Sequence, residues 1–159
     1  MTLLLPVISE KTIYRIDGET GDILHTRRSP KKGSARDILP ELYWIKESLG
    51  DPRLEIRVLL ISAEEHRFSE RMRYRREGAY DSELYPKELL GEERYSQIED
   101  FRVFLPDAER FRVAEYGKFI GLKGRAVYSS LNALCALGLL TKEKEGRSVW
   151  YYKKEKTRA

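Results

Sequence analysis

The feature that most constrains the fold of this chain is an apolar helical pattern between two glycines near its C-terminus. From Gly121 to Gly138, the apolar residues Val127, Leu131 and Leu134 recur every three or four positions, so they lie on one face of an α-helix. Glycine commonly ends a helix because it adopts the left-handed conformation without a steric penalty. The pattern therefore predicts an amphipathic helix whose apolar face is buried against a small core.

The other faces of this helix, which we expect to span Lys123 to Leu137, carry polar and basic side chains. These residues are Lys123, Arg125, Tyr128, Ser129 and Asn132. Side chains of these types contact phosphates and base edges in complexes with DNA. Beyond Gly138, the sequence LLTKEKEGRSVWYYKK predicts two short strands joined across Lys144 to Ser148, with Arg147 at the tip.

Three shorter elements are predicted before this helix. Residues 97–105 have helical spacing and a proline follows them, Phe111 to Val113 form a short strand, and AEYGKFIGL forms a two-turn helix that ends at Gly121. The order of helix, strand, helix, turn, helix and two-stranded wing resembles the winged helix-turn-helix domain of bacterial transcription regulators. The resemblance covers residues 97–154, which we assign to a second domain.

This resemblance implies a DNA-binding site. Lys123, Arg125, Tyr128, Ser129 and Asn132 would face the major groove, and Arg147 would reach the adjacent backbone or the minor groove. Lys142, Lys144 and Lys153 would be peripheral phosphate contacts. The alternative is a winged-helix domain that serves only as a protein-interaction adaptor, and a homodimer is also compatible with this architecture.

The positive charge of the chain is concentrated in its last third. Residues 106–159 hold 12 lysines and arginines against 6 acidic residues, whereas residues 1–105 hold 18 against 20. A local cationic excess favours a polyanionic partner, because neutralising phosphates releases condensed counterions. We therefore expect duplex DNA as the partner. A solvated basic surface with a basic tail at 155–159 is the alternative explanation.

The first 96 residues predict a small mixed α/β domain, so the whole chain belongs to the α+β class. The turn sequence DGETGD connects a hairpin of Thr12–Ile16 and Asp22–Arg27. A helix follows, with Asp37 as its N-cap and Pro40 in its first turn. Its apolar face is formed by Ile38, Leu42, Ile45 and Leu49.

Two strand-like segments complete this first domain. LEIRVLLIS at 54–62 predicts a strand that is mostly buried on both faces, and RMRYRRE at 71–77 predicts an edge hairpin with a cationic face. Glu64, Glu65 and His66 are consecutive, so on a strand they point to alternating sides and are not expected to bind a metal together.

The order of hairpin, helix and strand resembles the central part of the PD-(D/E)XK nuclease core. That chemistry requires an Asp on one strand and Glu-x-Lys on the next, so that two carboxylates hold a divalent ion. Asp17 fits the first position, but His25, Thr26 and Arg27 stand where Glu-x-Lys is required. The resemblance therefore implies a degenerate version without catalytic residues, with an active metal-dependent nuclease as the alternative.

The segment RRSPKKG places four cations beside a proline and a glycine. Arg27, Arg28, Lys31 and Lys32 form a candidate phosphate-binding loop, and a solvated turn is the alternative. No nucleotide loop and no metal-spaced set of Cys and His occurs elsewhere in the sequence. We therefore expect neither a metal nor another cofactor.

Three observations bear on the compartment. Cys135 is the only cysteine, which excludes a disulfide within the chain and favours a reducing environment. No apolar stretch is long enough for a membrane span. The scarcity of Asn, Gln and Cys among many Lys, Arg and Glu is typical of heat-adapted proteins. The sequence thus predicts a cytoplasmic, non-catalytic DNA-binding protein that resembles transcription regulators.

Overall fold

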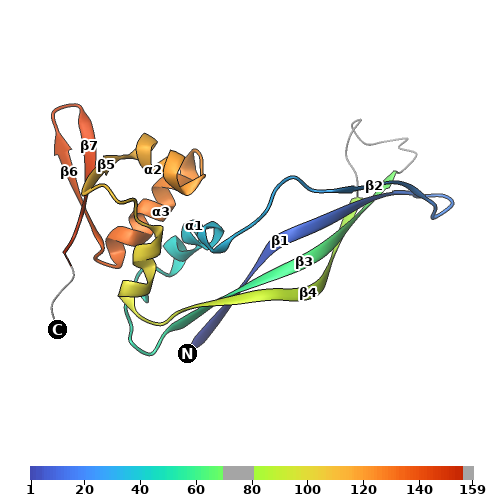
Figure 1. Ribbon diagram of the computed structural model, residues 1–159, viewed down its shortest axis with the longest axis horizontal. Helices are drawn as coiled ribbons and strands as arrows, with labels where there is room; N and C mark the ends of the chain where they lie inside the picture. Colours follow the sequence, from blue (N-terminus) through green and yellow to red (C-terminus); the bar gives the residue numbers. More distant parts are fainter. Residues whose placement is uncertain (70–80, 156–159) are drawn as a thin grey trace. The chain divides into compact units, whose positions relative to one another are not determined.

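The computed structural model describes residues 1–69 and 81–155 (Figure 1). The protein is of the α+β class, as expected, with a four-stranded sheet of order β2-β1-β3-β4 and a three-stranded sheet of order β5-β7-β6. The predicted cationic hairpin at 71–77 and nearly all of the basic tail lie outside the described residues. Within the described part of the chain, no helix is long and apolar enough to cross a membrane.

The larger sheet is built from long strands. These are β1 (Thr2–Asp17), β2 (Ile23–Arg28), β3 (Glu55–Ser69) and β4 (Asp81–Tyr95). The predicted hairpin is present, with Thr12 opposite Arg28 and Ile13 opposite Arg27, although β1 begins ten residues before the predicted start. On β3, Ile56 and Val58 are buried and alternate with half-buried neighbours, so this strand is not buried on both faces as we expected.

Strand β4 was not predicted. Its sequence, DSELYPKELLGEERY, lacks the alternation of apolar and polar residues by which a half-buried strand is recognised. The side chains from 82 to 90 are all exposed. The strand lies at the edge of the sheet and carries Pro86, and prolines and charges are typical of edge strands because they block pairing with another chain.

The chain forms two compact units. One, here the sheet unit, consists of Pro6–Ser34 and Leu59–Glu92, and the other, here the helical unit, consists of Met1–Leu5, Ala35–Val58 and Glu93–Ala159. This division differs from the boundary that we expected between residues 96 and 97. The segment Ala35–Val58 belongs with the C-terminal residues because its Leu39 and Leu42 are buried and its helix packs against α3.

The segment expected to form one helix from Asp37 to Leu49 is instead a series of short turns. A 3-10 helix (η1, Ala35–Ile38) precedes α1 (Leu39–Leu42), and a second 3-10 helix (η2, Tyr43–Ile45) follows it. Pro40 lies in the first turn of α1, as expected, but the N-cap is Ile38 and no side chain caps it. The prediction of Asp37 as the cap was wrong because Asp37 lies inside the preceding 3-10 turn.

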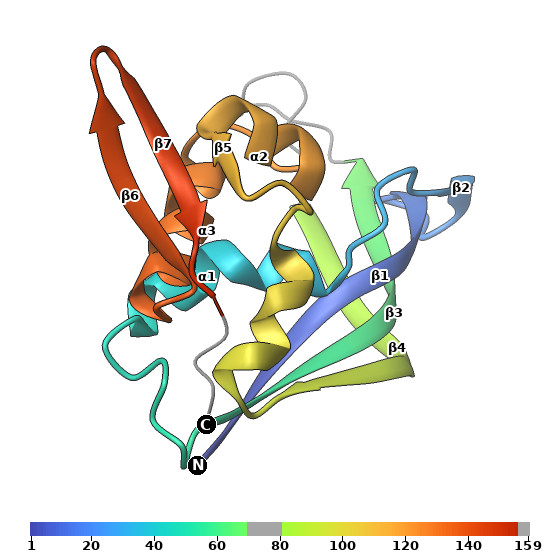
Figure 2. The same cartoon turned by 60° about the vertical axis from the view of Figure 1, so that its left-hand side comes forward.

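The remaining elements of the helical unit follow the predicted order (Figure 2). They are η3 (Ile98–Phe104), β5 (Arg110–Arg112), α2 (Val113–Ile120), α3 (Arg125–Ala136), β6 (Leu140–Glu145) and β7 (Ser148–Lys153). Their core contains Phe111, whose ring stacks on Tyr116 and on Tyr151 with centroids 5.5 and 6.2 Å away. Leu131 and Leu134 of α3 are also fully buried.

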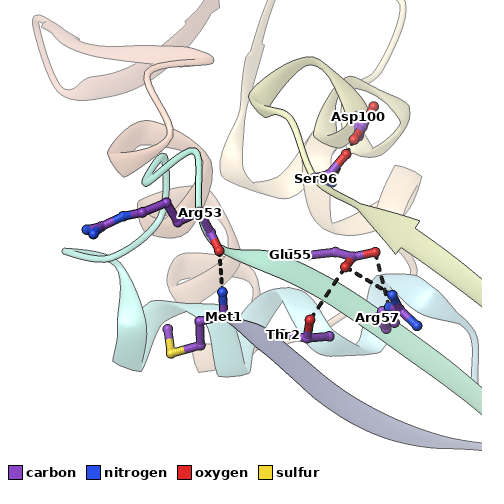
Figure 3. A network of polar contacts seen from close by, with 7 residues as sticks. All are labelled: Met1, Thr2, Arg53, Glu55, Arg57, Ser96 and Asp100. Atoms are coloured by element: carbon purple, nitrogen blue, oxygen red, sulfur yellow. Dashed lines mark hydrogen bonds and ion pairs between the residues drawn. The ribbon is translucent and has the colours of Figure 1, made fainter.

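Polar contacts fix the first residues of the chain within the helical unit (Figure 3). The N-terminal ammonium of Met1 donates to the carbonyl of Arg53 over 2.6 Å. Glu55 accepts two hydrogen bonds of 3.1 Å from Arg57 and one of 3.5 Å from the hydroxyl of Thr2. The starts of β1 and β3 are therefore held together by backbone and side-chain bonds.

The helical turn η3 is closed by its own side chains. Asp100 accepts a hydrogen bond of 2.8 Å from the backbone N–H of Ser96 (Figure 3). It accepts a second, of 2.9 Å, from the backbone N–H of Gln97. The side chain of Gln97 in turn accepts from the backbone of Asp100, which completes a capping box. The segment is a 3-10 helix, whereas the spacing of its apolar residues predicted an α-helix.

Candidate nucleic-acid interface

The turn between α2 and α3 is built on glycines and on one distant side chain. Gly121 ends α2 with a φ of 76°, in the left-handed region, and its N–H donates to Gly117 over 3.0 Å. Arg36 donates from Nη1 to the carbonyl of Ile120 over 3.3 Å. Because that carbonyl belongs to the last turn of α2, it has no partner within the helix. The guanidinium of Arg36 therefore satisfies and orients this end of the turn.

Helix α3 buries the face that the sequence predicted. Val127, Leu131 and Leu134 are all at most 4% exposed. Ser130 is also fully buried, and its hydroxyl donates to the carbonyl of Ala126 over 2.8 Å. Ser130 is therefore not available to a ligand.

The predicted DNA-contacting residues lie outside this buried face. Arg125, Tyr128 and Asn132 are exposed, and Ser129 is half-buried. Lys123 is exposed as well, but it lies in the turn before α3, because Gly124 is the N-cap and the helix begins at Arg125. The exposed surface of Arg125, Tyr128, Ser129 and Asn132 is called the α3 face below.

Tyr128 lies between two shallow depressions of the surface. One is lined by Lys118 of α2 and Lys123 of the turn, and the other by Asn132 and Lys142 of β6. Tyr128 lines both and is 54% exposed. Each of the two depressions that meet at Tyr128 is thus lined by at least one lysine. Lys118 was not among the predicted residues. Its position between Tyr116 and Ile120, which are four residues apart and share one helix face, could have indicated that it lies on the open side of α2.

The hairpin of β6 and β7 ends in the predicted turn. Glu145 is opposite Ser148, which leaves Gly146 and Arg147 as the two residues of the loop. Gly146 has a φ of 60°, as a type II′ turn requires at its first central position. The side chain of Arg147 is exposed at this tip.

The side chains of the hairpin point to two faces. Lys142 is opposite Tyr151, and Lys144 is opposite Val149, so both lysines share the face that carries the buried Tyr151 and lines the depression beside Tyr128. Lys142 and Lys144 are exposed. The face of β6 that bears these lysines is therefore the one directed toward α3.

The opposite face of the three-stranded sheet carries an aromatic and cationic ladder. The guanidinium groups of Arg110 and Arg112 lie 4.6 and 5.3 Å from the ring centroid of Trp150. Arg112 also pairs with Glu115, and Arg110 with Glu145. These cations are engaged within the protein.

Lys153 and Cys135 are part of the structural framework. The ammonium of Lys153 donates to the carbonyls of Pro106 and Asp107 over 3.1 and 2.9 Å, so the prediction of a peripheral phosphate contact is not supported there. Burial raises the pKa of the Cys135 thiol, which favours the unreactive protonated form.

The four cations of the predicted phosphate-binding loop do not all lie at one site. Arg28 and Lys32 line a pocket of about 260 Å³ in the sheet unit, and Lys31 is not part of its lining. Arg27 is opposite Ile13, whereas Arg28 is opposite Thr12, so the two arginines point to different faces of the sheet. The pocket also contains Lys11, Lys87 and three glutamates: Glu10, Glu64 and Glu88.

Asp17 is the carboxylate that fits the nuclease resemblance, and its side chain stabilises the turn between β1 and β2. Its Oδ1 accepts hydrogen bonds from the N–H groups of Glu19 and Thr20, over 2.8 and 3.2 Å. This arrangement is typical of Asp at the start of a tight turn. Within residues 1–69 and 81–155, no group of three or more His, Cys, Asp and Glu side chains is placed to hold a metal ion.

Comparison with known proteins gives one match, to a family model over the N-terminal part of the chain. No curated protein and no solved structure matches the chain. The model of the family described as a domain of unknown function (DUF8091) matches residues 1–96. This match ends where the sequence analysis placed a boundary, and it includes Arg36, Leu39 and Leu42, which the structure places in the helical unit. The chain therefore belongs to the DUF8091 family.

Proposed function

We propose that the helical unit is a winged helix-turn-helix domain that binds duplex DNA, and that the protein is a non-catalytic, transcription-regulator-like protein of the cytoplasm. The observation that carries this proposal is the placement of Tyr128. It is an exposed aromatic residue on α3 that lines two depressions, and each of them also contains lysine. Cations that flank a polar helix face match the two phosphate backbones that flank a major groove.

In this proposal the α3 face enters the major groove. Tyr128, Ser129 and Asn132 offer hydrogen bonds and an aromatic edge to the bases, and Arg125 at the start of the helix offers a bidentate donor to a phosphate. Lys118 and Lys123 contact one backbone, while Lys142, Lys144 and Arg147 of the wing contact the other. The backbone contacts set position and affinity, and the helix face supplies the sequence preference.

The charge distribution predicts binding that is mainly electrostatic. The α3 face carries only one charge, at Arg125, and its remaining residues are neutral. Each phosphate that is neutralised contributes about 0.9 to the slope of log K against log salt concentration. The affinity should therefore fall steeply between low and physiological salt.

The direct test is fluorescence anisotropy with a labelled duplex at several salt concentrations. We expect a steep salt slope that decreases in Arg125→Ala. Arg53→Ala is the matched control, because it removes an equal charge at an exposed site outside both depressions. An absence of binding at low salt would reject the proposal and favour the protein-interaction adaptor.

Catalysis is tested separately with duplex DNA, magnesium and manganese. We expect no cleavage by the wild-type protein. Metal-dependent cleavage that is abolished in Asp17→Ala would establish the nuclease alternative. Sedimentation of the free protein and of its complex distinguishes a monomer from a homodimer.

A further inference from the structure

One face of the sheet unit brings charged and aromatic side chains together. Thr12 of β1 is opposite Arg28 of β2, and both line the 260 Å³ pocket. Glu64 of β3 lies 3.5 Å from the ammonium of Lys87 on β4, and both line the same pocket. The pocket therefore extends across the sheet.

An aromatic row continues this face. Tyr14, His66 and Tyr85 each lie two residues from a strand residue of the pocket, so they point to the same side about 7 Å farther along the strands. Their contacts agree with this placement, because the ring centroid of His66 is 5.3 Å from that of Tyr14 and 4.8 Å from that of Tyr85. Tyr85 is 42% exposed. A planar group beside the pocket would find an aromatic surface.

The cations of the pocket fall into two classes. Lys87 pairs with Glu64, and Lys11 pairs with Glu65 over 2.5 Å. Arg28 and Lys32, in contrast, form no ion pair with any other residue that the structure describes. Two neighbouring cations without carboxylate partners are suited to an anionic group, and a guanidinium binds phosphate through two hydrogen bonds.

A carboxylate narrows the chemistry of the ligand. Glu10, on the same side of β1 as Thr12, also lines the pocket and has no partner among the described residues. A bare phosphate ion would be repelled by this carboxylate, whereas a ligand with hydroxyl or amino donors beside its phosphate would give it a hydrogen bond. The pocket is near the lower size limit of small-molecule sites, so part of such a ligand extends over the aromatic row.

We propose that this pocket binds a mononucleotide. Arg28 and Lys32 hold the phosphate, Glu10 accepts hydrogen bonds from the ribose hydroxyls, and the base stacks beside Tyr85. One ligand would thus contact the unpaired cations, the carboxylate and the aromatic row of this face. The site lies in the sheet unit and does not depend on DNA binding by the α3 face.

Isothermal titration of the full chain with adenosine monophosphate tests this assignment. We expect saturable binding that weakens at least tenfold in Arg28→Ala and in Lys32→Ala. Arg27→Ala is the matched control and should bind as the wild type does, because its side chain points to the opposite face. An absence of binding at millimolar nucleotide, or equal losses in Arg27→Ala and Arg28→Ala, would overturn the proposal.

Two further titrations test the parts of the ligand. Ribose 5-phosphate should bind several-fold more weakly than adenosine monophosphate and should be insensitive to Tyr85→Leu, whereas the nucleotide should lose affinity in that variant. Equal affinity for both ligands would contradict stacking of the base. Thermal melting of Tyr85→Leu confirms that the variant is folded.

The same assay distinguishes a free mononucleotide from a nucleotide within a nucleic-acid strand. A single-stranded oligonucleotide that bound more tightly than the mononucleotide through Arg28 would reassign the site to a nucleic-acid strand. Loss of nucleotide binding in Arg125→Ala would place the ligand on the α3 face and overturn the pocket. Duplex binding measured in parallel is expected to be unchanged in Arg28→Ala, so this proposal and that of DNA binding can fail independently.

Discussion

Arg36 donates a hydrogen bond to the carbonyl of Ile120, a residue 84 positions later in the chain. The donor lies in the segment matched by the DUF8091 family, and the acceptor is the last residue of α2. The same segment supplies Leu39 and Leu42, which are at most 1% exposed. The part of the chain that resembles a winged helix therefore includes residues from the middle of the family domain.

This dependence predicts that residues 97–159 do not fold alone. Without α1, the surface of α3 that packs against it would be exposed to water. We expect the isolated fragment to show no cooperative thermal transition by circular dichroism, whereas the full chain melts cooperatively. In the full chain, Leu39→Ala should lower the free energy of unfolding by about 3 kcal/mol. A sharp melting transition of the fragment would contradict this interpretation.

The hydrogen bond of Arg36 can be tested by itself. Arg36→Met keeps much of the aliphatic chain but removes the donor, so the carbonyl of Ile120 loses its partner. We expect a loss of about 1 kcal/mol in the free energy of unfolding, measured by urea denaturation. Arg147→Met, the same substitution at an exposed site of the same unit, is the control and should change stability by less than about 0.5 kcal/mol.

The hydroxyl of Tyr116 predicts a stabilising substitution. Tyr116 is fully buried, and its hydroxyl has no hydrogen-bond partner among the described residues. Because an unpaired buried hydroxyl is costly, Tyr116→Phe should raise the free energy of unfolding by about 1 kcal/mol. Tyr95→Phe is the contrasting variant, since the hydroxyl of Tyr95 donates to Glu93 over 2.6 Å and its removal should be destabilising. A destabilised Tyr116→Phe would show that the hydroxyl has a bound partner.

Glu65 predicts a pH dependence of stability in the sheet unit. Hydrogen bonds from Arg67 and Lys11 lower the pKa of this buried carboxyl below its ordinary value. A lowered pKa in the folded state means that the contribution to stability is fully present above the unfolded value of about 4.3 and is lost as the pH falls through the folded value. Thermal melting of Glu65→Gln should therefore show a lower melting temperature at pH 7 and a weaker dependence between pH 5 and pH 3.

The two kinds of contact in the proposed DNA complex predict different signatures. Lys123→Ala removes a phosphate contact and should lower the slope of log K against log salt by about 0.9. Tyr128→Ala removes a neutral contact to the bases and should leave that slope unchanged, while it weakens binding to a selected sequence about tenfold, or about 1.4 kcal/mol. Anisotropy titrations at four salt concentrations separate the two. A changed slope in Tyr128→Ala would show that the tyrosine does not act as proposed.

The sequence by itself determined the local elements of the helical unit. The spacing of Val127, Leu131 and Leu134 predicted the buried face of α3, and Gly138 marked its end, although the helix begins at Arg125, two residues after the predicted start. It also determined the hairpin with Arg147 at its tip. These features depend on periodicity and on the left-handed backbone of glycine, which act over a few residues.

Only the tertiary structure decided which segments belong together. The sequence gives no sign that Arg36 reaches the end of α2, or that Leu39 and Leu42 belong to the core of the C-terminal elements, because these pairs are far apart along the chain. It could not separate Arg27 from Arg28 either, because strand register sets the face to which each points. Burial and pairing between distant segments are properties of the whole fold, and no local pattern encodes them.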